Sequence, residues 1–260
     1  VNTRRRLVDL YITSYNRSLL LAEVLKSVLN SISYSKKLRF RITVIIDKYD
    51  DNYLDVIRQY GNKVSFVCLQ LNLGLPFALN FLRKHTQLVS ERTEEFSDFI
   101  CYLQDDCLIE AEEIFFDTLV SAYDKLDPVY NIGYLSGFHC DLHPGFDKTS
   151  FDGHTVVLSD SIDGKMFFGS SSVFNSVGDI PWYFGREKDF APKGNPGPIY
   201  GSHFDLWQWK ESPRSLVRQG RLNLIFPGFC THLCAQVESS TWNNDTSEAF
   251  VKSRIQEGRV

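Results

Sequence analysis

Residues 99–106 read Phe-Ile-Cys-Tyr-Leu-Gln-Asp-Asp, an apolar run that ends in one amide and two carboxylates. A short apolar run of this kind predicts a strand buried on both faces, as in parallel sheets. Successive side chains of a strand point to opposite sides, so one of Asp105 and Asp106 is expected to face a ligand while the other supports the loop. In an alternative that stays open, the pair only caps the helix expected over residues 111–126.

The sequence before this run alternates between strand and helix patterns. Strands are expected over residues 8–13, 42–46 and 64–69, and helices over residues 21–28, 53–60 and 77–88. This alternation predicts an α/β fold with a mostly parallel central sheet and helices on both faces. Ligands of such sheets bind beyond the carboxyl ends of the strands. Polar residues that we expect to converge there are Tyr15, Asn16, Arg17, Asp47, Asn72, Asp105 and Asp106.

The second half of the chain has shorter and more aromatic patterns. From Ile132 onward, strands are expected over residues 133–137, 156–158 and 166–174. We interpret them as antiparallel strands and loops that pack onto the sheet. Residues 185–201 are rich in glycine and proline and are expected to form a long mobile segment.

The composition is that of an ordinary globular protein. Of the 260 residues, 43% are hydrophobic and 23% are charged, which excludes disorder and predicts one large domain with a sizeable core. The formal net charge of −4 provides no overall positive field for binding nucleic acid. Residues 1–41, however, hold nine basic and two acidic residues. This basic edge is either a solvated surface or a patch for phosphate or a membrane surface.

The cysteines and the apolar segments bear on the compartment. Six cysteines lie mostly in apolar stretches without CxxC spacing, which favours buried thiols in a reducing compartment. We therefore expect a cytoplasmic protein, with a position peripheral to a membrane left open by the basic edge. The longest uncharged stretch, residues 65–82, contains Asn72, Gly74 and Pro76, so no transmembrane segment is expected. No signal peptide is visible, although the sequence begins at Val1 rather than at a methionine.

The sequence has neither a Walker loop nor a GxGxxG motif. It has four other motifs instead: Thr13-Ser14-Tyr15-Asn16-Arg17, Asp47, Asn72-x-Gly74 and Gln104-Asp105-Asp106. In this order they resemble glycosyltransferase family 2 enzymes with the GT-A fold, over about residues 7–245. The resemblance implies a Rossmann-like, mostly parallel sheet with a C-terminal antiparallel, loop-rich part. It also implies one domain over residues 1–260, with a nucleotide-sugar half at about 7–130, an acceptor and catalytic half at about 131–245 and a tail at 246–260.

The resemblance also assigns roles to residues. It implies that Asp106 and His232 bind Mn²⁺ or Mg²⁺, and that Asp205 is the catalytic base. Two residues depart from the family pattern: Gln104 replaces a carboxylate that contacts ribose, and Cys234 replaces a glycine two residues after His232. The positions implied to bind the nucleotide sugar are Thr13, Tyr15, Arg17, Asp47, Asn72, Gly74, Gln104 and Asp105.

By resemblance, the expected function is metal-dependent transfer of a sugar, with inversion, from a nucleoside diphosphate to a hydroxyl acceptor. UDP is the expected nucleotide because it is the commonest in the family. A glycan or lipid-linked saccharide is the expected acceptor, while protein and DNA acceptors stay open. Two alternatives also remain. A catalytically inactive module that only binds nucleotide sugars is motivated by Gln104. A nucleotidyltransferase would share the carboxylate-bound metal, but its glycine-rich phosphate loop is missing.

Overall fold

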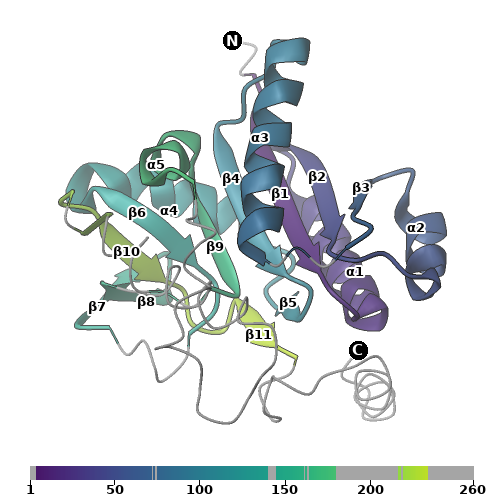
Figure 1. Cartoon of the computed structure of the whole chain (residues 1–260). Coiled ribbons are helices and arrows are strands. Elements are labelled where there is room, and N and C mark those ends of the chain that lie inside the picture. The colour runs from purple at the N-terminus through teal and green to yellow at the C-terminus, as the bar shows by residue number, and fades with distance from the viewer. Residues whose placement is uncertain are drawn as a thin grey trace, which may run out of the picture.

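The computed structural model describes residues 4–71, 73, 75–139, 145–160, 162, 164–179, 216–217 and 219–233. In this part of the chain, nine strands form one mixed sheet in the order β3-β2-β1-β4-β9-β6-β10-β8-β7 (Figure 1). A separate antiparallel ladder joins β5 (Cys107–Ile109) to β11 (Cys230–His232). The strands of the large sheet are β1 (Arg6–Ser14), β2 (Leu38–Ile46), β3 (Ser65–Cys68), β4 (Phe99–Gln104), β6 (Ile132–Ser136), β7 (Asp147–Phe151), β8 (His154–Ser159), β9 (Met166–Ser170) and β10 (Leu222–Ile225).

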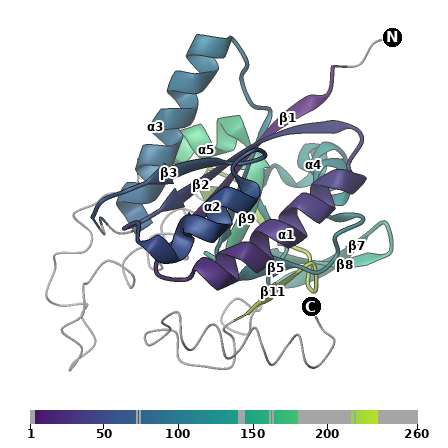
Figure 2. The same cartoon turned by 90° about the vertical axis from the view of Figure 1, so that its right-hand side faces the viewer.

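Helices cover both faces of the sheet, as Figures 1 and 2 show. They are α1 (Ser18–Tyr34), α2 (Leu54–Tyr60) with the preceding turn η1 (Asp51–Tyr53), α3 (Leu75–Thr93), α4 (Phe115–Tyr130) and α5 (Ser171–Val177). Along β1, Leu10 and Ile12 pack in one hydrophobic cluster with α1, α2 and α4. Tyr11 lies between them in sequence and packs in a second cluster with α3 and α5. This alternation is the period of two of a strand, and it divides the core into two layers.

The predicted parallel half is confirmed. Strands β3, β2, β1 and β4 are parallel neighbours in the predicted order of strand and helix. The expected helix over residues 111–126 starts later, at Phe115, and continues to Tyr130. The α/β fold class with helices on both faces is therefore as expected.

The second half differs from the expectation in one respect. Strands β9, β6, β10, β8 and β7 extend the same sheet instead of packing onto it. On the side away from β1, the backbone N–H and C=O groups of β4 still need hydrogen-bond partners. The antiparallel strand β9 provides them. The element expected over residues 166–174 is divided, because Ser170 accepts a hydrogen bond from Val173 N and caps α5. The segment 185–201 lies outside the described residues.

Among the helices of the described ranges, none combines the length and the apolar character needed to cross a bilayer.

Candidate functional site

Three parallel strands end in register at one edge of the sheet. Ser14 at the end of β1 lies opposite Ile46 at the end of β2, and Thr13 lies opposite Gln104 at the end of β4. The next residues continue these contacts, since Asp47 N donates to Ser14 O over 2.8 Å and Asp105 N donates to Thr13 O over 3.2 Å. The predicted convergence of these strand ends is therefore present in the structure.

The turn from β1 to α1 is held by buried side chains. Its residue Asn16 has a φ of 53°, in the left-handed region that asparagine tolerates better than most residues. The hydroxyl of Tyr53, which is fully buried, donates to Ser14 Oγ over 2.9 Å and accepts from Arg17 N over 3.0 Å. Ser14 Oγ in turn donates to Asp105 Oδ2 over 2.7 Å, and Tyr15 N lies 3.4 Å from the same oxygen. Asp105 thus fixes the turn to the end of β4.

Both adjacent carboxylates meet one guanidinium group. Arg17 Nη1 lies 2.7 Å from Asp106 Oδ2 and 3.3 Å from Asp105 Oδ1. Strand β4 ends at Gln104, so Asp105 and Asp106 lie in the turn to β5 and not on a strand. Asp105 supports the turn after β1, as expected of one of the two carboxylates. The capping alternative is wrong. Helix α4 begins at Phe115, and its N-cap Ile114 has no side-chain cap.

The ladder of β5 and β11 brings His232 to Asp106. His232 lies opposite Cys107, and Leu233 N donates to Asp106 O over 2.8 Å. His232 Nε2 consequently lies 3.1 Å from Asp106 Oδ2. The imidazole ring and the ring of Phe138 lie at 75° to each other, with ring centroids 6.0 Å apart. Asp106 and His232, both expected at the cation site, therefore lie together, although the pairing of β5 with β11 that brings them there was not expected from the sequence.

The surroundings set the charges of the two carboxylates. Burial raises the pKa of Asp105 to about 6, against the lowering effect of Arg17 and together with the like charge of Asp106. Burial also opposes the ionisation of Asp106. Lys165, His232 and Arg17 nevertheless hold the pKa of Asp106 well below its ordinary value. Asp106 therefore remains an anion at neutral pH, as a cation ligand must.

Sequence reasoning did not single out Lys165 as a member of this cluster. Its Nζ lies 3.7 Å from Asp106 Oδ2 and donates to Gln104 Oε1 over 3.0 Å. Residues 163–165 match no motif. The antiparallel register pairs Leu103 of β4 with Met166 of β9, and this register places the preceding residue, Lys165, opposite Gln104. Gln104 was expected among the residues that bind the nucleotide sugar, and its amide contacts the turn that contains Lys165.

The structure places the remaining expected residues as follows. Thr13 Oγ1 is hydrogen-bonded to Tyr102 over 2.8 Å and is buried, whereas Tyr15 is 46% exposed at the edge of the sheet. Asp47 is buried, and its Oδ1 accepts from Leu73 N over 2.8 Å, which ties the turn after β3 to the end of β2. The expected residues Asn72, Gly74, Asp205 and Cys234 lie outside the described residues.

The donor set at Asp106 fits a divalent cation. Asp106 Oδ1 is buried and has no hydrogen-bond partner within the described ranges. Asp106 Oδ2 and His232 Nε2 are hydrogen-bonded over 3.1 Å, so a carboxylate and an imidazole, both of which can bind Mn²⁺, lie side by side. The described residues contain no cluster of three or more His, Cys, Asp or Glu side chains able to bind a metal. The other ligands would thus come from a bound diphosphate or water, as is usual for Mg²⁺.

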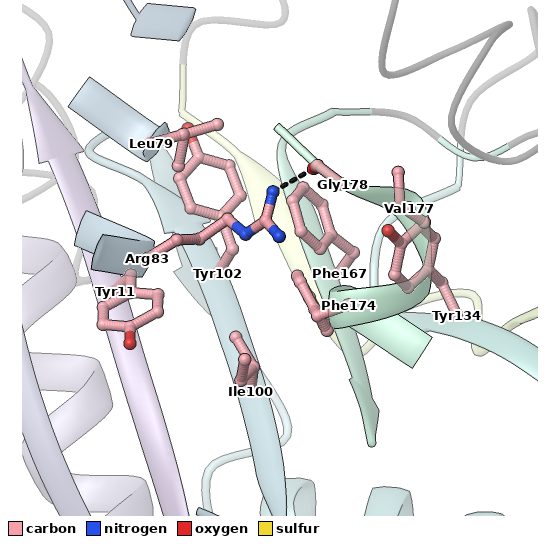
Figure 3. Close-up of a pocket in the computed structure, with 10 residues that line it drawn as sticks. All are labelled: Tyr11, Leu79, Arg83, Ile100, Tyr102, Tyr134, Phe167, Phe174, Val177 and Gly178. Carbon is pink, nitrogen blue, oxygen red and sulfur yellow. Dashed lines mark hydrogen bonds between the residues drawn. The ribbon is translucent and has the colours of Figure 1, made fainter. Parts of the chain in front are cut away.

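A separate apolar cavity of about 40 Å³ lies between α3 and α5 (Figure 3). Arg83 of α3 reaches across it and donates to Gly178 O, while the rings of Tyr102, Phe167 and Phe174 form much of its wall. This cavity is far smaller than the several hundred Å³ of typical ligand sites. It is therefore a gap in the packing between α3, α5 and the sheet, too small for a nucleotide sugar.

Comparison with known proteins bears on the fold and on the first half of the chain. Residues 9–134 match the model of glycosyl transferase family 2. No curated protein matches the sequence. Among solved structures, the mannosyltransferase PcManGT from Pyrobaculum calidifontis, in complex with GDP-Man and Mn²⁺, matches 92% of this chain with 15% identity and a TM-score of 0.55. TarS from S. aureus matches 95% of the chain with 12% identity and a TM-score of 0.53.

These likenesses concern the fold, because both identities are low. The chain spans 59% of the length of PcManGT and 42% of that of TarS. The matched region 9–134 contains most of β1, all of β2 and β4, and the carboxylates that follow β2 and β4. Residues 9–134 accordingly resemble glycosyl transferase family 2, and the chain has the GT-A fold.

Proposed function

We propose that this protein transfers a sugar from a nucleoside diphosphate, UDP in the first instance, to a hydroxyl acceptor with inversion at the anomeric carbon. The observation that carries the proposal is the cluster of Asp106, His232 and Arg17 at the carboxyl ends of the parallel strands. We assign donor binding to about residues 7–130, and acceptor binding and catalysis to about residues 131–245. This division is supported by the position of the cluster at the ends of β1 and β4, next to β9.

The residues around the cluster suggest how the donor would lie. Asp47, at the end of β2, is assigned to the nucleotide base, and Leu73 N orients its carboxylate. Tyr15, which follows the end of β1, is 46% exposed, and we assign its ring to stacking on the donor. Thr13 supports the floor of the site through Tyr102. Asn72 and Gly74 are assigned to the turn that flanks the base.

The leaving diphosphate needs positive charge as the glycosidic bond breaks. A bound Mn²⁺ or Mg²⁺ would neutralise this charge as a Lewis acid. Asp106 and His232 would hold the cation, and the lowered pKa of Asp106 keeps its carboxylate ionised for that purpose. Asp105 braces Ser14 and Tyr15, so it keeps the turn that borders ribose and diphosphate in place.

The acceptor hydroxyl must lose a proton as it attacks. We assign this proton to the carboxylate of Asp205, from the resemblance to the family. Attack on the face opposite the diphosphate inverts the anomeric centre. Asp205→Asn should retain donor binding and lose about 10²- to 10⁴-fold in transfer rate. A variant of nearly full activity would remove Asp205 from this role.

The charges of the first 41 residues bear on the acceptor. Five of their nine basic residues pair with carboxylates of the described chain, which favours a solvated surface over a patch for DNA. The pairs are Arg6 with Asp124, Arg17 with Asp105 and Asp106, Lys26 with Glu23, Arg39 with Glu95, and Arg41 with Asp9. We propose a glycan or lipid-linked saccharide as the acceptor and a cytoplasmic location, peripheral to a membrane where the acceptor carries a lipid.

Hydrolysis of the donor tests the proposal without an acceptor. UDP-sugars and GDP-mannose, the donor in the PcManGT complex, are incubated with the protein and Mn²⁺, and nucleoside diphosphate release is measured with and without EDTA. Release that EDTA abolishes supports a metal-dependent transferase. Binding without any release would indicate a binding module. Release of pyrophosphate from a nucleoside triphosphate would indicate a nucleotidyltransferase.

A further inference from the structure

We propose that Lys165 binds the diphosphate of the donor and that Gln104 positions it there. This inference rests on the proposed function, since it concerns the same site. Lys165 belongs to the turn before β9, and its Nζ lies 3.7 Å from Asp106 Oδ2, the same oxygen that Arg17 Nη1 contacts over 2.7 Å. Its side chain is 18% exposed, while Asp106 beside it is fully buried. The ammonium group therefore lies at the boundary between the buried carboxylates and the space where a ligand would bind.

Both the oxygen and the nitrogen of the Gln104 side-chain amide contact this turn. Its Oε1 accepts from Lys165 Nζ over 3.0 Å, and its Nε2 lies 3.4 Å from Gly164 O. The backbone adds a third link, because Gln104 N donates to Lys165 O over 2.9 Å. A neutral amide is thus used to orient a cation. This contact explains how Gln104 can stand at the position where family 2 enzymes usually carry a carboxylate.

The charge of the site shows why an amide suits this position. Arg17 and Lys165 balance the two carboxylates Asp105 and Asp106 in formal charge. A third carboxylate at position 104 would pair with Lys165 directly and weaken its attraction for other anions. A glutamine orients the ammonium by a hydrogen bond without adding a further negative charge beside it. The arrangement therefore adds a cationic group to the diphosphate site.

The test separates phosphate binding from contact with ribose. UDP and uridine are titrated into the wild-type protein and its variants by calorimetry in the presence of Mn²⁺, and GDP and guanosine replace them if guanine is the base that binds. Lys165→Met should weaken UDP binding about tenfold or more and change uridine binding less than about twofold. Lys165→Arg should restore most of the UDP affinity. Lys148→Met, which removes an exposed lysine of β7, is the matched control.

Two Gln104 variants test the positioning role. Gln104→Glu should weaken UDP binding and spare uridine, because the new carboxylate would neutralise Lys165. Gln104→Leu should act in the same direction, and adding Lys165→Met to it should cause little further loss. Equal losses for UDP and uridine would assign Gln104 to ribose and overturn the inference. Unchanged UDP affinity in Lys165→Met would also overturn it and leave the proposed function standing. If the wild-type protein binds neither UDP nor GDP, both proposals fail.

Discussion

Asp106 Oδ2 and His232 Nε2 lie 3.1 Å apart, although 126 residues separate them in the sequence. The two side chains meet because β11 pairs with β5, directly after Asp106, and because Leu233 N continues this ladder to Asp106 O. The position of the imidazole therefore depends on a pair of three-residue strands and on the packing behind them.

Gly137→Ala tests this dependence. A methyl group at Gly137 would lie 2.9 Å from Cys230 Sγ and 3.1 Å from atoms of Phe115 and Phe229. Gly137 O also accepts from Cys230 N, so the clash acts directly on β11. We expect the free energy of unfolding, measured by urea denaturation, to fall by about 1–3 kcal/mol. We also expect a weaker effect of Mn²⁺ on nucleotide binding. A variant with unchanged stability and an unchanged response to Mn²⁺ would show that β11 is not packed as described.

Tyr53→Phe tests the support of the turn between β1 and α1. The substitution leaves Arg17 N and Ser14 Oγ without their buried partner, which should lower the free energy of unfolding by about 1–3 kcal/mol. Tyr34→Phe is the matched control, since Tyr34 is 48% exposed at the end of α1 and its hydroxyl can bond to water. Equal urea midpoints for the two variants would contradict the role of Tyr53.

His232→Ala tests the second ligand of the proposed cation. Loss of the imidazole should raise the Mn²⁺ concentration required for tight UDP binding at least about tenfold, because even the loss of a residue that only supports a ligand can cost this much. His85→Ala on α3 serves as a control, because His85 stacks on Phe81 away from Asp106. The assignment of His232 fails if both variants need the same Mn²⁺ concentration as the wild-type protein.

The sequence was sufficient to predict the parallel half of the fold. Residues 42–46 and 99–103 are nearly continuous apolar runs, and a polar residue follows each of them. Both the strands and the sheet edge at which they end could therefore be inferred. The order of Tyr15, Arg17, Asp47 and Asp106 then suggested the family. These predictions rest on patterns within short stretches of sequence, which a single sequence shows most clearly.

The remaining features depend on contacts between distant residues. Strands β5 and β11 have three residues each, too few for a pattern, and their pairing decides where His232 lies. The pairing of β9 with β4 brings Lys165 to Gln104, and no sequence motif predicts the register of this pairing. The buried hydroxyl of Tyr53 was likewise not apparent, since residues 53–60 indicated only an amphipathic helix. In each case the information lies in tertiary packing.

The central claim is that the ends of distant strands form one site for a cation and a diphosphate. It is tested most directly by calorimetric titration of UDP into the wild-type protein and into Asp106→Asn, each with Mn²⁺ and with EDTA. The asparagine keeps the shape of the side chain and removes the charge that the cation requires. We predict that EDTA weakens UDP binding at least about tenfold in the wild-type protein and has no effect on the variant. Equal UDP affinity in all four titrations would contradict the claim.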